Sequence, residues 1–321
     1  MNPRCATLAA GAVLALAART VRCQQPADSN KLDLDRVRGT ALVFAAPDSA
    51  RLRGYTRLRP LSRVPGLNPF VGEHWIKERW LRLASLDPER PAYLMYYPIA
   101  GSERLVGFGY AFVQPSGAPL PRGFSGAVVR WHLHHPCTGL PGLGSLLVAS
   151  AAECRELGGA PGATQIVMLH VWLDPANPDG EFASENPALP FVAAGLAPPD
   201  SAALADPGRG MFLRELGLAL GETVGARPRL GTIVEFGRDS ARFRRKAEPL
   251  RARLRGLAES LRAAEQAGDR KQYESLATRS VDVGRKLRQI YLDLASEPVV
   301  RSLLVKWFDA VLMPGEHGPA H

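Results

Sequence analysis

The sequence has few cysteines and few long apolar runs. Only four of its 321 residues are cysteine, and the CxxC…CxxC spacing of a zinc ribbon does not occur. Beyond the N-terminus, no run is long and apolar enough to form a membrane-spanning helix, which takes about 20 residues. These absences exclude a zinc-ribbon protein and a protein with several membrane-spanning helices.

Common catalytic and binding motifs are also missing. The sequence contains no G-x-S-x-G elbow, Walker loop, HExxH pair or kinase motif. The loop that begins at Asp174 does not fit a calcium-binding EF-hand, because Ala176 and Pro178 stand at its third and fifth positions. Aromatic residues make up 7% of the chain and do not alternate with the basic residues, as base-stacking proteins require. We therefore expect no nucleic-acid partner.

The N-terminus is typical of a secretory signal. Arg4 precedes an apolar run over residues 5–18, and residues 15–17 offer a small-x-small cleavage pattern. Cys23, which is followed by a polar stretch, is a second candidate for the end of the signal, as a lipidated cysteine that anchors the chain to a membrane. We predict a signal peptide or lipoprotein signal over residues 1–23 and export to the bacterial periplasm or cell envelope.

A tether is predicted over residues 24–35, and a globular chain follows, since overall composition is 46% hydrophobic and 22% charged. Runs rich in β-branched and aromatic residues predict four strands, and an apolar stretch between the last two predicts a helix. The strands are expected over residues 92–97, 104–113, 128–137 and 166–174, and the helix over 141–157. The pattern indicates an α+β domain over residues 36–195, built as an antiparallel sheet or small barrel with helices.

The C-terminal third has the periodicity of packed helices. After a predicted linker over residues 194–208, apolar residues recur at spacings of four and three over residues 243–264 and again over 273–294. Two such seams joined by a short turn predict an antiparallel helical hairpin, and a closing helix begins at Pro298. We predict an all-α domain over residues 205–313. Most of the net charge of +9 lies here, which is typical of a solvated helix surface.

Histidines concentrate in two of the predicted strands. His132 and His134 alternate along one strand and so share a face, and His170 lies on the other. If these strands pair, three imidazoles converge, which is the smallest set for a metal site. His74 is a candidate fourth ligand. Neutral imidazole binds zinc and copper, so the pattern predicts a mononuclear Zn or Cu site.

Other interpretations of these residues stay open. Asp174 and Glu181 could act as ligands or as outer partners of such a site. The histidines could instead be half-exposed sheet residues beside aromatic rings. A cupin is a minor alternative, because the spacing from Gly126 to His132 matches the start of its first motif, although the glutamate that should follow is absent.

The cysteines that follow the predicted signal suggest a disulfide. Cys5 belongs to the signal, and Cys23 is the candidate for lipidation. Cys137 and Cys154 are then left in an oxidising compartment, where they can form a bridge, the alternative being two buried thiols.

Four short segments resemble an uncharacterised family of bacterial secreted proteins. They are Gly-x-His-Trp at 72–75, Leu-Val-Gly-x-x-Tyr at 105–110, Trp-His-x-His with a nearby Cys at 131–137, and His-Val-Trp with Asn-Pro-x-Gly-x-Phe-Ala and Asn-Pro at 170–187. The resemblance covers about residues 70–195 and implies no particular activity. Members often carry a glutamate where this chain has Gly109, so the resemblance implies that one potential ligand is missing here.

Two functions follow from these patterns. The first is an exported protein of unknown reaction that holds Zn or Cu through His132, His134, His170 and His74. A closed site would be structural or carry the metal, whereas an open position would allow hydrolytic or redox chemistry. The second is a metal-free interaction module of the cell envelope that binds a partner or associates with itself through the helical hairpin. Its histidines would then be packing residues.

Overall fold

A computed structural model describes residues 34–58, 69–121, 124 and 130–313, except for 36, 40, 83–85, 141–143, 225–239 and 296–297. The predicted signal, Cys23 and nearly all of the predicted tether lie outside these residues. Within the described ranges, no helix is both long enough and apolar enough to cross a membrane.

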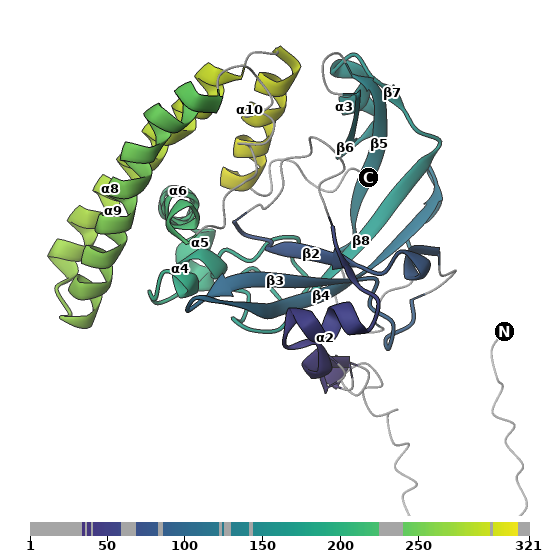
Figure 1. Ribbon diagram of the computed structural model, residues 1–321, viewed down its shortest axis with the longest axis horizontal. Coiled ribbons are helices and arrows are strands. Elements are labelled where there is room, and N and C mark those ends of the chain that lie inside the picture. Colours follow the sequence, from purple (N-terminus) through teal and green to yellow (C-terminus); the bar gives the residue numbers. More distant parts are fainter. Residues whose placement is uncertain are drawn as a thin grey trace, which may run out of the picture.

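The fold is α+β, as predicted (Figure 1). The N-terminal part holds most of the strands, and the C-terminal part is helical. In chain order the elements are η1 (Leu42–Phe44), α2 (Pro47–Leu52), β1 (Thr56–Arg57), β2 (Glu73–Ile76), η2 (Glu78–Arg82), β3 (Tyr93–Ile99), β4 (Ser102–Pro115), β5 (His132–Leu140), β6 (Gly144–Val148), α3 (Ala151–Glu156), β7 (Ala160–Pro161), β8 (Thr164–Trp172), α4 (Leu189–Ala193), α5 (Ser201–Ala205), α6 (Pro207–Thr223), α8 (Ser240–Gln266), α9 (Arg270–Leu294) and α10 (Pro298–Leu312).

The described strands form one antiparallel sheet in the order β1-β2-β3-β4-β8-β5-β6, with β7 paired to β5. The last strand in sequence, β8, lies between β4 and β5. The sheet curls like half of a barrel, so that β5 and β6 rise away from the plane of β2, β3 and β4 (Figure 1). This order and this curl decide which histidines can meet.

The sheet buries apolar side chains on both of its faces. Because side chains alternate along a strand, neighbouring residues of β3 and β4 point to opposite sides. One face, which includes Leu94, Phe108 and Leu169, packs against η1 and α2. The other face includes Tyr93 and Trp172 and packs against α4. We call this second surface the concave face.

The predicted seams of the hairpin are buried between helices of this chain. Side chains of α8 and α9 pack on each other, on α6 and on α10 in one hydrophobic cluster. Its buried seam residues include Ala247, Leu254, Leu257, Leu261, Ala264, Leu276, Val283 and Leu287. Pro249 lies inside α8. Contacts within this chain therefore already occupy the seams. Self-association through the hairpin stays a prediction, and it would have to use other surfaces of the helices.

A buried polar network lies within these helices. Nε of Arg251 donates to Glu222 at 3.1 Å, and the hydroxyl of Tyr291 donates to the same carboxylate at 2.7 Å. Both charged side chains of this pair are about 95% buried, since their exposed fractions are 5% and 6%. The network therefore ties α6, α8 and α9 together at a depth where an unpaired charge would be costly.

The predicted linker over residues 194–208 is wrong. Residues Ser201–Ala205 form α5, and α6 begins at Pro207. The side chains of Asp200 and Asp206 cap these helices by accepting bonds from the backbone of Ala203 and Arg209. The sequence pattern did not predict α6, because glycines, which are poor helix formers, interrupt the apolar pattern of this segment.

The helix predicted over residues 141–157 is also wrong in its first half. Gly144–Val148 form β6, which pairs with β5, and only Ala151–Glu156 form a helix, α3. A short apolar run cannot be assigned to strand or helix by periodicity alone. The hydroxyl of Ser150 accepts a bond from the backbone of Glu153 at 3.1 Å and marks where the helix begins.

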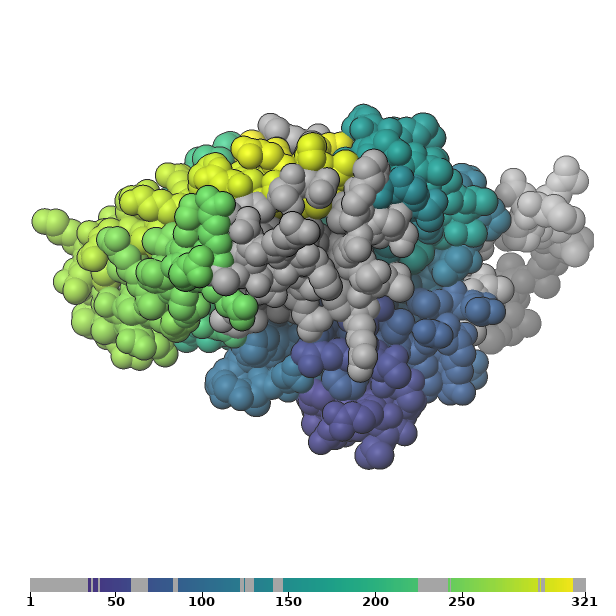
Figure 2. All heavy atoms as spheres, turned by 45° about the horizontal axis from the view of Figure 1, so that its top comes forward, coloured from purple at the N-terminus to yellow at the C-terminus, as the bar shows by residue number. Residues whose placement is uncertain are grey.

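The far end of the sheet and the helices share a core. Leu140 and Val148, from β5 and β6, belong to the same hydrophobic cluster as α6, α8, α9 and α10. Lys306 of α10 also pairs with Glu156 of α3 at 2.9 Å. The space-filling view shows α10, in yellow, in contact with the teal part of the chain that holds β6 and α3 (Figure 2). The helical part thus packs directly on the strand that carries His132 and His134.

Candidate metal centre

Four histidines from three strands lie side by side on the concave face. Their rings follow one another in a row from β5 through β8 to β2. The ring centres are separated by 5.3 Å between His134 and His132, 4.6 Å between His132 and His170, and 5.6 Å between His170 and His74. All four residues predicted as ligands therefore meet, and we call them the His row.

Strand register explains the part of the row from β5 and β8. The two strands pair with His132 opposite Met168 and His134 opposite Ile166. His170 is two residues beyond Met168 on β8, so alternation places its side chain on the same face. The conditional prediction that three imidazoles converge if the strands pair holds in this register.

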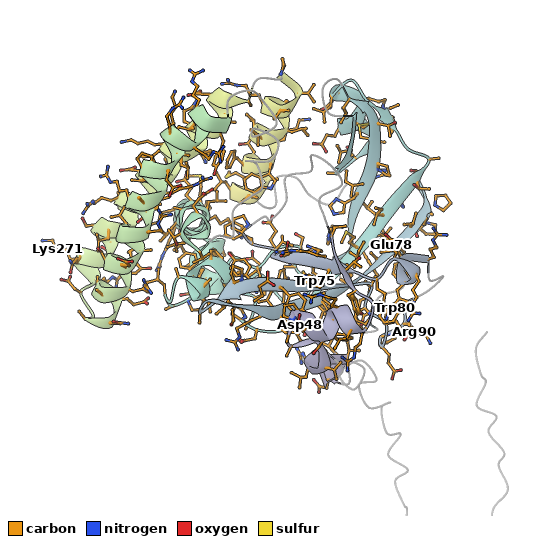
Figure 3. All side chains as sticks on the ribbon, in the orientation of Figure 1. Asp48, Trp75, Glu78, Trp80, Arg90 and Lys271 are labelled. Carbon is orange, nitrogen blue, oxygen red and sulfur yellow. A yellow bond between two sulfur atoms is a disulfide. The ribbon has the colours of Figure 1, made fainter. Side chains whose placement is uncertain are left out.

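The curl of the sheet explains His74. Two strands, β3 and β4, separate β2 from β8, so a flat sheet would keep their backbones about 14 Å apart. The rings of His74 and His170 nevertheless lie 5.6 Å apart, because the sheet bends toward this face. The adjacent Trp75 (Figure 3) does not join them, since it packs on the opposite face with Tyr96.

Gly109 leaves space for the Tyr93 ring, which lies beside the row. In the sheet it lies opposite His170 on one side and Tyr93 on the other. A Cβ at this position would stand 2.1 Å from the Tyr93 ring and 2.4 Å from the Leu169 carbonyl oxygen. Instead, the Tyr93 ring fills the gap, 5.0 Å from the ring of His74, and its hydroxyl donates to Leu169 at 2.8 Å. A glutamate at position 109 would not fit beside this tyrosine.

A loop between β8 and α4 fixes the orientation of His170. Its Nδ1 lies 2.7 Å from the carbonyl oxygen of Ser184, which can only accept a hydrogen bond. Nδ1 therefore carries the proton, and Nε2 keeps its lone pair. Ligand histidines in metal sites are held by the same kind of backbone contact.

The same loop is rigid because its asparagines fold it onto itself. Asn186 donates to the carbonyl of Pro175 at 2.9 Å and accepts from the backbone of Ala188 at 3.0 Å. Asn177 accepts from the backbone of Asp179. These Asx turns give the Asn-Pro motifs a structural role.

Two ring nitrogens of the row are buried without a partner among the described residues, namely Nε2 of His170 and Nδ1 of His132. Leaving such a nitrogen buried and unsatisfied costs about 1–3 kcal/mol. A bound ion that accepts the lone pair would remove this cost. Nδ1 of His135, on the opposite face of β5, is buried without a partner in the same way, so the two nitrogens of the row count only together with the meeting of its rings.

The pKa values of all four imidazoles lie below the usual range. Burial, which disfavours the charged form, lowers the pKa of His74 and His134 to about 4, and the other histidines add to the effect. The pKa values of His132 and His170 are lowered well below normal, first by burial and then by neighbouring histidines. The row is therefore neutral at pH 7, which is the form that binds metals.

The other predicted residues do not join the row. Asp174 is exposed, and Glu181 forms an ion pair with Arg38. Strand alternation turns His135 to the opposite side of β5. Cys137 and Cys154 form a disulfide with their Cα atoms 5.5 Å apart, and Cys23 lies outside the described residues.

The row as it stands is not yet a coordination sphere. In the part of the chain that the structure describes, no three His, Cys, Asp or Glu side chains are already arranged to hold a metal ion. The rings of His132 and His134 stand nearly perpendicular to each other, at 88°, as do those of His132 and His170, at 74°. Binding would require the rings to turn about their side-chain torsions.

Sequence reasoning missed the residues that shape the site. Tyr93, Met168 and Ser184 border the row, but their roles depend on sheet register and on a loop that folds back. Only Gly109 left a signal, as a glycine within a strand that indicates close packing.

Comparisons with known proteins do not assign the chain to a family. No protein-family model matches the chain, and searches of curated proteins and of solved structures found no match either. The resemblance to a family of bacterial secreted proteins stays a prediction.

Proposed function

We propose that this chain is an exported metal-binding protein whose His row holds one transition-metal ion. The observation that carries the proposal is the meeting of four neutral imidazoles with two buried, unpartnered ring nitrogens.

The spacing of the rings supports a single ion. A metal about 2.0–2.1 Å from each nitrogen in tetrahedral geometry would place ring centres about 5 Å apart. The neighbouring centres of the row are 4.6–5.6 Å apart. The neighbouring pairs thus have the separation that two imidazoles on one ion require, once their rings turn.

Export is part of the proposal. The disulfide between Cys137 and Cys154 supports it, because disulfides persist in oxidising compartments. His74, His132 and His134 are only half-buried, so one side of the row is reachable from solvent. That side is where a coordination position would be open to a small ligand or to a second protein.

Elemental analysis tests the proposal. Protein purified from its exported fraction without an affinity tag should carry about one equivalent of Zn or Cu. A His132→Gln/His170→Gln variant should lose the metal. His135→Gln is the matched control, since this residue lies on the same strand but on the other face, and it should keep the metal. Metal-free wild-type protein that takes up no Zn or Cu when either is added would contradict the proposal.

A further inference from the structure

A methionine stands beside the His row. Met168 is the cross-strand neighbour of His132 and stands two residues before His170 on β8. Alternation therefore puts its side chain on the concave face, on the same side of the sheet as both imidazoles. It is half-buried and packs against the cluster that contains Trp172 and Tyr93, so it stays at the site.

The donors that the row offers are uncharged. Asp174 is exposed and Glu181 pairs with Arg38, so neither of the carboxylates predicted beside the row joins it. The two cysteines that follow in β5 and α3 form a disulfide and offer no thiolate. Of the described residues, the row thus offers nitrogen and sulfur donors without a negative charge.

A neutral donor set favours a singly charged ion. The cost of burying an ion rises steeply with its net charge, so a donor set without carboxylate or thiolate buries Cu⁺ at a lower cost than Zn²⁺. Thioethers are soft ligands that select Cu(I), and imidazole also suits copper. Zinc gains nothing comparable from a methionine.

We propose that the site selects copper, and that the sulfur of Met168 joins His132 and His170 in binding Cu(I). This inference rests on the proposed function and adds the identity of the metal and a sulfur ligand beside the imidazoles. No electron transfer or bond cleavage is part of it.

The test compares Cu(I) and Zn affinities in Met168→Leu. Cu(I) affinity is measured by competition with a chromogenic Cu(I) chelator, without oxygen and with ascorbate, which leaves the disulfide intact. Zn affinity is measured with a zinc chromophore. Met168→Leu should weaken Cu(I) binding at least tenfold and leave Zn binding within about twofold, since it removes only the soft donor. Met211→Leu, at a position that is 39% exposed on α6, is the matched control and should change neither affinity.

The outcomes separate the two proposals. Equal Cu(I) affinity in wild type and Met168→Leu, with Zn still bound, would overturn the role of Met168 and leave the His row as a metal site. Wild-type protein that binds neither ion would overturn both. Leucine conserves the volume of methionine, so the variant should fold. X-ray absorption of the Cu(I)-loaded wild type gives a second readout, in which a sulfur scatterer should be present and should disappear in Met168→Leu.

Discussion

Acidification should destabilise the metal-free protein through the His row. Burial holds the pKa of His74 and His134 at about 4, whereas the same groups in an unfolded chain titrate near 6.5. As the pH falls below 6.5, the unfolded chain takes up protons that the folded chain refuses, so the free energy of unfolding decreases. Above pH 6.5 both states are neutral, and this contribution disappears.

The size of the effect follows from the shifts. One pKa unit corresponds to about 1.4 kcal/mol. A shift from 6.5 to about 4 therefore lowers the free energy of unfolding near pH 4 by up to about 3 kcal/mol for each group, relative to neutral pH. Solvent reaches these half-buried rings and reduces that figure. Because a charge on one imidazole opposes a charge on the next, the row takes up protons in steps. His132 and His170 therefore extend the loss to lower pH.

Urea unfolding of chelator-treated protein between about pH 7.5 and pH 4.5 measures this loss. The double variant His74→Gln/His134→Gln should show a flatter dependence of unfolding free energy on pH, since two of the titrating groups are gone. His317→Gln, which changes a histidine outside the described residues, serves as control and should follow the wild type. If the double variant and the wild type have the same slope, the coupled, buried row that we describe does not exist in solution.

Three further predictions concern stability. Gly109→Ala should lower the free energy of unfolding by about 1–3 kcal/mol, because its Cβ would stand 2.1 Å from the Tyr93 ring. Gly256→Ala, which has open space around it in α8, should raise that free energy by about 0.5–1 kcal/mol in the same denaturation assay. Arg251→Met should lower the free energy of unfolding by about 3–5 kcal/mol, because it leaves the buried carboxylate of Glu222 without its cation. Tyr291→Phe, which removes only a hydrogen bond to Glu222, should lower it clearly less, and equal losses would refute the importance of the charge. Cys154→Ser should lower stability by roughly 3 kcal/mol, since it opens a loop between residues 17 apart, and reduction of the wild type should reproduce the loss.

The sequence was enough to predict the elements that have a clear period. The seams of α8 and α9 follow spacings of four and three, and residues such as Leu254 and Leu287 are buried as expected. Alternation along β5 and β8 likewise placed His132, His134 and His170 correctly relative to one another once the strands pair. Regular periodicity carries this information because it reports directly which side of an element is buried.

The rest depended on long-range geometry. His74 reaches the row only because the sheet curls across two intervening strands, and periodicity within one strand says nothing of that curvature. The roles of Tyr93 and Met168 follow from register with partners far away in the sequence. Ser184 supports His170 through its backbone carbonyl, which any residue could supply. Such a contact leaves no trace in the residue type.

The most direct test of the account is anomalous diffraction from crystals grown with copper and, separately, with zinc, each recorded at the absorption edge of its metal. We expect one peak on the concave face, with Nε2 of His170 and a nitrogen of His132 about 2.0–2.1 Å from it and a third imidazole completing the set. The contact from Nδ1 of His170 to Ser184 should be unchanged. Crystals in which both metals bind only elsewhere, and in which the rings of the His row keep their present orientations, would contradict the account.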